Sequence, residues 1–147
     1  MVISDTHKNI SFAVDFLSKH EEVHSVIHLG DLVSDADDLQ SCFPEKKFLK
    51  IRGNNDFFRK APEELIINIY GRKTLICHGH RYGVKTGLKR LSLSAVKKGV
   101  QVVLFGHTHI PCDEVVGGVR LINPSSCGFV LIDSGFAVQS LNPQENF

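Results

Sequence analysis

The chain contains 147 residues, of which 42% are hydrophobic and 22% are charged. This balance is typical of a compact globular protein, and we predict one domain over residues 1–147. The formal net charge is only +1, so charge alone indicates neither a nucleic-acid coat nor an acidic membrane surface as a partner. No apolar run approaches the roughly 18 residues that cross a bilayer, so we expect a cytoplasmic protein without membrane contact.

The four cysteines are far apart in the sequence, at Cys42, Cys77, Cys112 and Cys127. No Cys-x-x-Cys pair is present, which argues against a zinc ribbon and against a redox motif. We therefore predict free thiols. Cys77 falls inside an apolar run, where a cysteine usually behaves as a small buried hydrophobic residue.

The first third of the chain alternates strand and helix patterns. Ile10, Ala13, Val14 and Leu17 recur at helical spacing between two short apolar runs. A third strand pattern follows a poorly defined, weakly helical stretch over residues 35–42. This alternation is typical of an α/β domain. The predicted strands of this part cover residues 1–4, 25–29 and 47–51.

The rest of the chain is richer in strands. Apolar residues on one helical face predict a helix from Val84 to Ala95, and Gly99 stands where its C-terminal cap is expected. Elsewhere, turn residues such as Tyr70-Gly71-Arg72 separate pairs of β-rich runs and predict hairpins. The predicted strands of this part cover residues 64–69, 73–77, 100–105, 114–116, 119–122, 129–132 and 136–141.

Polar clusters follow five of the predicted strands, each at the carboxyl end of the strand. In open α/β sheets ligands bind beyond the carboxyl ends of the strands, so five segments can converge on one site. Five of the eight histidines lie in these clusters. The clusters are Asp5-Thr6-His7, Gly30-Asp31, Gly53-Asn54-Asn55-Asp56, His78-Gly79-His80 and Gly106-His107-Thr108-His109.

The clusters supply carboxylate, amide and imidazole groups and no thiolate. This mixed oxygen and nitrogen set suits Mn²⁺, Fe or Zn²⁺ better than Ca²⁺. Glycines directly before Asp31, Asn54 and His107 let the backbone turn sharply and bring the next side chain close to an ion. Alone, a motif such as Asp-x-His is usually a turn or a helix cap. The prediction of a metal site therefore depends on the coincidence of the clusters at successive strand ends.

In this order, the five clusters resemble the motifs of the calcineurin-like metallophosphoesterase superfamily. More closely, the chain resembles its small bacterial and archaeal phosphodiesterase branch, in which an Asn-Pro-Gly-Ser segment is similar to Asn123-Pro124-Ser125-Ser126. The resemblance covers nearly the whole chain. It implies an α/β fold in which a two-sheet β-sandwich is flanked by helices, in four layers.

The resemblance also implies a centre of two divalent ions, with Mn²⁺ expected first and Zn²⁺, Fe or Ni²⁺ as alternatives. Asp31, Asn54, His78 and Asp56 are expected to take part in catalysis, and Asp31 to bridge the ions. Two cations about 3.5 to 4 Å apart lower the pKa of a water between them, and the resulting hydroxide attacks phosphorus in line. The implied ligands of one ion are Asp5, His7, Asp31 and His109, and those of the other are Asp31, Asn54, His78 and His107.

The segment Gly53-Asn54-Asn55-Asp56 departs from the Gly-Asn-His-Glu of phosphatases in the wider superfamily. That histidine is associated with phosphate binding or with protonation of the leaving group, so its absence disfavours alkyl monoesters such as phosphoserine. Asp56 instead matches the acidic residue of the phosphodiesterase branch. We therefore expect a small phosphodiester, or an ester with a good leaving group, as the substrate.

Several alternatives stay open from the sequence. The enzyme could be a nuclease or a cyclic-nucleotide phosphodiesterase, and a homo-oligomer is compatible with the chain. A non-catalytic scaffold, as in the retromer subunit that resembles this superfamily, is disfavoured because all seven ligand positions carry side chains able to bind a metal. The basic stretch from Arg81 to Lys98 is either a solvated helix face or a rim that attracts phosphate or nucleic acid, although no aromatic residues are interleaved for stacking.

Overall fold

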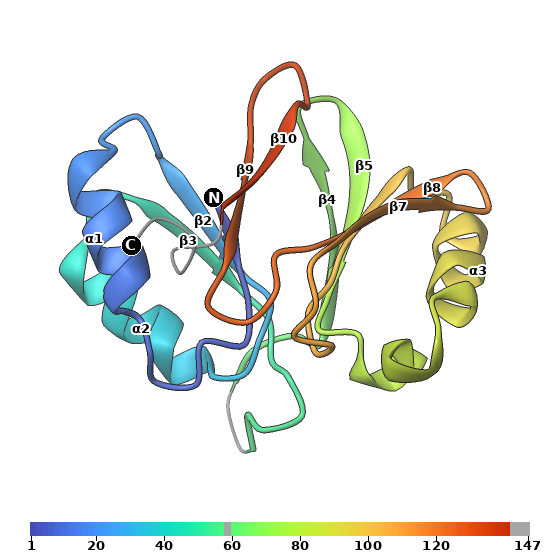
Figure 1. The fold of residues 1–147 in the computed structure, drawn as a ribbon, viewed down its shortest axis with the longest axis horizontal. Helices are drawn as coiled ribbons and strands as arrows, with labels where there is room; N and C mark the ends of the chain where they lie inside the picture. The colour runs from blue at the N-terminus through green and yellow to red at the C-terminus, as the bar shows by residue number, and fades with distance from the viewer. Residues whose placement is uncertain (58–59, 142–147) are drawn as a thin grey trace.

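A computed structural model describes residues 1–57 and 60–141, which form two mixed five-stranded sheets (Figure 1). The first sheet contains, in spatial order, β10 (Val138–Leu141), β9 (Phe129–Ile132), β1 (Val2–Ile3), β2 (Ser25–His28) and β3 (Lys47–Lys50). The second sheet contains β4 (Glu64–Ile69), β5 (Arg72–Cys77), β6 (Val102–Leu104), β8 (Val119–Asn123) and β7 (Cys112–Val116).

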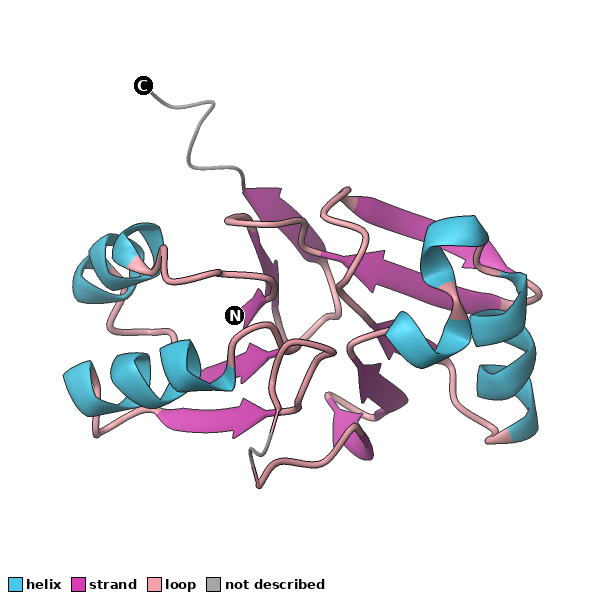
Figure 2. Cartoon of the chain, turned by 90° about the horizontal axis from the view of Figure 1, so that it is seen from below, coloured by secondary structure: helices cyan, strands magenta, loops and turns pink. Residues whose placement is uncertain are grey.

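Helices cover the outer face of each sheet, so the molecule has four layers (Figure 2). Helices α1 (Ser11–Lys19) and α2 (Val33–Cys42) lie on the first sheet, and α3 (Lys89–Lys97) lies on the second. Two short 3-10 turns, η1 (His80–Tyr82) and η2 (Val84–Thr86), precede α3. This arrangement confirms the predicted β-sandwich flanked by helices.

Alternation along the strands distributes the apolar side chains among three layers of core. In β1, Val2 packs between the two sheets, whereas Ile3 packs beneath α1 and α2. In β6, Val102 and Leu104 face the core between the sheets, and Val103 faces α3. A strand that is buried on both faces reads as a continuous apolar run, which is why these segments were recognisable in the sequence.

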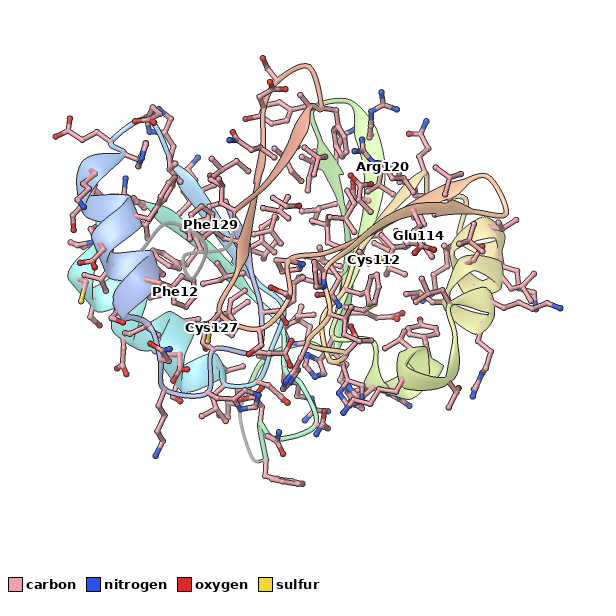
Figure 3. All side chains as sticks on the ribbon, in the orientation of Figure 1. Phe12, Cys112, Glu114, Arg120, Cys127 and Phe129 are labelled. Carbon is pink, nitrogen blue, oxygen red and sulfur yellow. The ribbon has the colours of Figure 1, made fainter. Side chains whose placement is uncertain are left out.

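Aromatic packing holds the helical layer on the first sheet. The ring of Phe12 in α1 stacks parallel to that of Phe129 in β9 at a centroid distance of 6.4 Å (Figure 3). Phe16, one helical turn further along α1, packs against the same ring at 4.3 Å. These contacts fix α1, and with it the loop that joins β1 to α1.

The parallel strands bring their carboxyl ends to one edge of the molecule. Strands β1, β2 and β3 are parallel in the first sheet, and β5, β6 and β8 are parallel in the second. The loops that follow them gather at the lower edge of Figure 1. The predicted hairpins pair β4 with β5, β7 with β8 and β9 with β10 in antiparallel register.

Several element boundaries differ from those predicted, and two of the differences have a clear local cause. Helix α3 begins at Lys89 and not at Val84, because Gly87 has a φ angle of +141° that an α-helix cannot accommodate. The last strand begins at Val138 because Phe136 has a φ of +60° and turns its buried side chain into the core between the sheets. Both differences arise at single residues with a positive φ angle.

The cysteines agree with the prediction of free thiols. All four cysteines are free, and burial raises the pKa of the Cys77 thiol. Within residues 1–57 and 60–141, no helix combines the length and the hydrophobicity that a bilayer crossing requires.

Candidate metal centre

Six of the seven predicted ligands gather in two groups at the edge where the strands end. We call Asp5, His7 and His109 the open triad, because both of its histidines are exposed. We call the second group the closed triad, because its members are buried or half-buried: Asp31, His78 and His107. In each triad, one candidate ligand atom of every residue lies within 4.8 Å of the others.

The closed triad is organised around the buried imidazole of His78. Its Nδ1 lies 2.7 Å from the carbonyl oxygen of Leu29 and donates a proton to it. In the neutral ring, Nε2 is then an unprotonated acceptor, as a metal ligand must be. This Nε2 lies 3.5 Å from Oδ2 of Asp31 and is buried without a hydrogen-bond partner.

The open triad surrounds Asp5, whose side chain is fully buried. One oxygen, Oδ2, accepts hydrogen bonds from the Ser4 hydroxyl at 2.5 Å and from the His107 amide at 2.9 Å. The other oxygen, Oδ1, lies 3.2 Å from Nε2 of His109 but forms no hydrogen bond. The Nε2 atoms of His7 and His109 face each other at 3.4 Å.

The two triads are contiguous, because Oδ1 of Asp5 also lies 3.8 Å from Nε2 of His78. Buried polar atoms in proteins are nearly always paired, so the unpartnered Asp5 Oδ1 and His78 Nε2 require an explanation. Both atoms face groups with lone pairs, and a cation between them would satisfy both. Carboxylate oxygens and imidazole nitrogens in this combination fit Mn²⁺, Fe or Zn²⁺.

Charge and burial set the protonation of the closed triad. Burial would raise the pKa of Asp31, but its interactions with His78 and Asn55 hold that pKa well below the usual range. Burial would lower the pKa of His78, but the Asp31 and Asp5 carboxylates outweigh it and raise that pKa. Burial lowers the pKa of His107 to about 4. Asp31 is therefore anionic and His107 neutral near pH 7.

Backbone conformation directs most of these side chains. Residues other than glycine rarely adopt a positive φ angle, which costs on the order of 1–3 kcal/mol and concentrates at functional sites. All three residues of the open triad and two of the closed triad have this conformation. The φ angles are +52° for Asp5, +45° for His7, +49° for Asp31, +68° for His107 and +62° for His109.

Two glycines allow loops of the site to approach the triad aspartates closely. A Cβ atom on Gly53 would clash with the carboxylate of Asp31, and one on Gly106 would clash with the side chains of Ser4 and Asp5. Both clashes involve a triad aspartate or its neighbour. Glycine at these two positions therefore lets the loops of β3 and β6 reach the site.

Asn54, the seventh predicted ligand, is placed differently from the other six. Its side chain is exposed and forms no hydrogen bond within the described residues. The next residue contacts the site instead: the amide of the Asn55 side chain donates to Oδ2 of Asp31 at 2.8 Å, and its backbone N–H donates to Oδ1 at 3.0 Å. These contacts do not test the role expected of Asn54. The contact of Asn55 with Asp31 was not predicted from the sequence.

Asp56, which we expected to take part in catalysis, lies behind the triads. It is buried and accepts three backbone N–H bonds, from Asp31, Val33 and Gly53, at 3.0, 2.6 and 2.7 Å. These bonds tie the loop after β2 to the loop after β3. Asp56 therefore supports the position of Asp31 through its backbone.

A second buried polar chain supports the open triad. The backbone N–H of Gly30 donates to Nδ1 of His28, so the Nε2 of this neutral ring donates to the Thr6 hydroxyl at 3.1 Å. Thr6 donates in turn to Asp35 at 2.5 Å, and burial lowers the pKa of His28 to about 4. The sequence carried no signal for Asp35, whose partner Thr6 is 29 residues away.

A cavity adjoins the closed triad on the side of η1. Its volume is about 380 Å³, and its lining includes Glu63, His78, His80 and Tyr82. The His80 ring lies 5.5 Å from that of His78 and 6.1 Å from that of His107, and its buried Nδ1 has no hydrogen-bond partner. The cavity offers room beside the triads for an organic group of a ligand.

Comparison with known proteins identifies the family. The model of the calcineurin-like phosphoesterase superfamily domain matches residues 1–142. YsnB of Bacillus subtilis, a probable metallophosphoesterase, is 34% identical over 128 residues, which cover 86% of this chain and 73% of that protein. The phosphodiesterase MJ0936 of Methanocaldococcus jannaschii is 33% identical over an alignment of 151 positions. The alignment covers 86% of this chain and 82% of the relative.

A solved structure extends the likeness in fold. Vps29 of Entamoeba histolytica, complexed with Zn²⁺, superposes with a TM-score of 0.73 over 95% of each chain. At 19% identity this likeness concerns the fold alone. The family match, the two relatives and the ordered motifs agree: the chain belongs to the calcineurin-like phosphoesterase superfamily.

Proposed function

We propose that the chain is a metal-dependent phosphodiesterase that holds two divalent ions in its two triads. The observation that carries this proposal is the pair of buried, unpartnered ligand atoms, Asp5 Oδ1 and His78 Nε2, 3.8 Å apart between the triads. The family and the relative named as a phosphodiesterase support it. We expect Mn²⁺ first, with Zn²⁺, Fe or Ni²⁺ as alternatives.

When bound, such ions supply positive charge for the phosphate oxygens and lower the pKa of a nucleophilic water. The protein contributes the position and the protonation of the ligands. Asp31 stays ionised because Asn55 and His78 stabilise its charge, and we propose that it bridges the two ions. His78 presents Nε2 because Leu29 holds its Nδ1 proton.

The proposed preference for diesters follows from the loop after β3. Where phosphatases of the superfamily have a histidine, this chain has Asn55, and both its side-chain amide and its backbone N–H are committed to Asp31. Asn55 therefore offers no titratable group to protonate a poor leaving group. Esters that leave without such assistance are the better substrates.

The test is hydrolysis of a bis-aryl phosphate diester by chelator-treated protein to which Mn²⁺ is restored. We expect metal-dependent turnover, and a loss of at least about a thousandfold in an Asp31→Asn, His109→Ala double variant, which removes one ligand from each triad. A phosphoserine peptide assayed in parallel should be hydrolysed far more slowly.

Each part of the proposal can fail separately. Comparable turnover of the phosphoserine peptide would refute the diester preference but not the esterase. Absence of turnover with Mn²⁺, Zn²⁺, Fe²⁺ and Ni²⁺ would refute the enzyme and favour a non-catalytic scaffold of the same fold.

A further inference from the structure

One flank of the site is rich in basic residues. Residues 81–98 include six lysines and arginines and no aspartate or glutamate. Arg81 and Lys98 are paired with Glu63 and Glu64, respectively. The other four are exposed and form no ion pair within residues 1–57 and 60–141: Lys85, Lys89, Arg90 and Lys97.

The first of these cations lies in a turn that packs on a loop of the closed triad. Lys85 belongs to η2, and its neighbour Val84 packs on the loop that carries His78, since a Cβ atom on Gly79 would meet Val84 at 3.0 Å. In Figure 1 the turns before α3 lie at the same lower edge as the loops of the site.

Arg90 reaches back toward the same turns. Its guanidinium Nη1 would lie 3.6 Å from a Cβ atom on Gly83, the residue that joins η1 to η2. Lys89 precedes it in the first turn of α3, so Lys85, Lys89 and Arg90 form a short strip of positive charge that begins at the turn packed on the His78 loop. We call these three residues the basic strip.

Helix stability does not explain the strip. Lys89 and Arg90 occupy the first turn of α3, which contains no acidic residue and no side-chain cap. The helix dipole disfavours positive charge at this end. A cluster of unpaired cations at a place where it weakens the helix, next to a phosphoesterase site, is suited to binding an anion.

We infer that the basic strip binds a second phosphate group of the substrate, outside the scissile diester. The inference rests on the proposed function, because the scissile phosphate is placed at the triads. A short oligonucleotide with a terminal phosphate has the required chemistry, with one diester to cleave and one further anion to hold. Lysine and arginine position a phosphate without reading the base, so the strip selects charge and not sequence.

The experiment compares two thymidine dinucleotides that share the same scissile bond, one with a 5′-terminal phosphate and one without. The variant Lys85→Ala, Arg90→Ala removes two charges from the strip. The control Lys47→Ala, Lys97→Ala removes two exposed charges, one on β3 and one at the far end of α3. A bis-aryl diester reports on the triads alone.

We expect the wild-type protein to prefer the phosphorylated dinucleotide by about tenfold in kcat/KM, and to lose that preference as salt is raised. The strip variant should lose the preference and keep its activity on the bis-aryl diester, whereas the control should keep both. Equal kcat/KM for the two dinucleotides in the wild-type protein, or an unchanged preference in the strip variant, would overturn the inference.

A binding measurement separates this inference from the proposed function. Fluorescence anisotropy of a labelled, 5′-phosphorylated oligothymidine with chelator-treated protein requires no turnover, and the strip variant should bind at least about fivefold more weakly than the control. If the protein has diesterase activity but the strip variant binds the oligothymidine as tightly as the control, the proposed phosphodiesterase function holds and the inference about the basic strip is wrong. Absence of any metal-dependent diesterase activity removes the proposed function, and the substrate inference with it.

Discussion

The two triads of the site differ in how the protein holds them. In the closed triad, His78 is buried and its ring is fixed by the Leu29 carbonyl, and Asp31 accepts hydrogen bonds from Asn55 and lies on a loop tied down by Asp56. In the open triad only Asp5 is buried, while His7 and His109 are exposed and face each other at 3.4 Å. The orientation of the side chains in the open triad is set mainly by the backbone, because all three residues have a positive φ angle.

This difference teaches that the two proposed ions depend on the protein in different ways. A ligand whose second ring nitrogen is already bonded loses little freedom when a metal binds. The exposed histidine side chains of the open triad lose conformational freedom when an ion binds, and they compete with water for the ion. We therefore expect the closed triad to bind its ion more tightly, and the open triad to lose its ion first during chelation.

The largest expected effect is the difference between a variant of His78 in the closed triad and a variant of His7 in the open triad. We expect His78→Ala to reduce kcat/KM for the bis-aryl diester by about a thousandfold, and His7→Ala to reduce it only about ten- to a hundredfold. His78→Ala removes a ligand and also leaves the carboxylates of Asp31 and Asp5 without the imidazole between them. Mn²⁺ titration by calorimetry should show that the tighter site disappears in His78→Ala. Equal losses in the two variants would show that the triads are not different in this way.

A second prediction concerns His28, whose hydrogen bonds to Gly30 and Thr6 connect the loop after β2 to the loop after β1. The pKa of His28 is lowered from 6.5 to about 4 by burial, so below pH 6.5 the unfolded chain binds a proton that the native protein does not. The stability linked to this residue is therefore complete above pH 6.5 and is lost as the pH falls toward 4, by about 3 kcal/mol.

The variant His28→Gln isolates this contribution. Glutamine can accept from Gly30 and donate to Thr6, but it does not titrate. The free energy of unfolding from urea titrations of metal-free protein should fall less steeply between pH 6.5 and 4 in the variant than in the wild type. Parallel pH profiles would contradict a neutral, buried His28.

The smallest expected effect distinguishes two neighbouring asparagines. If Asn54 is a ligand, as its motif implies, Asn54→Ala should weaken Mn²⁺ binding by about tenfold without changing the stability of the metal-free protein. Asn55→Ala should instead lower that stability by about 1 kcal/mol, because it removes a hydrogen bond to Asp31. Calorimetry and urea unfolding of the matched pair check both effects. Wild-type Mn²⁺ affinity in Asn54→Ala would exclude Asn54 from the ligands.

Much of the fold could be predicted because its signals are local. Apolar runs marked the strands, the glycine-containing turns marked the hairpins, and the polar clusters at strand ends marked the site. Prediction was weakest where a single positive φ angle decides a boundary, as at Gly87 and Phe136. The contact between Asn55 and Asp31 was also not predicted, since it depends on which side chain points at Asp31.

The sequence by itself determined the alternation of elements, the types of the metal-binding groups and their order along the chain. Only the tertiary structure decided how these groups divide into an open and a closed triad, and which residues support them. The physical reason is the range of the contacts. Hydrophobic periodicity and turn chemistry act over a few residues, whereas Thr6 meets Asp35 across 29 positions and His78 meets Leu29 across 49. Such pairs become neighbours only when the two sheets pack and their strand ends meet at one edge.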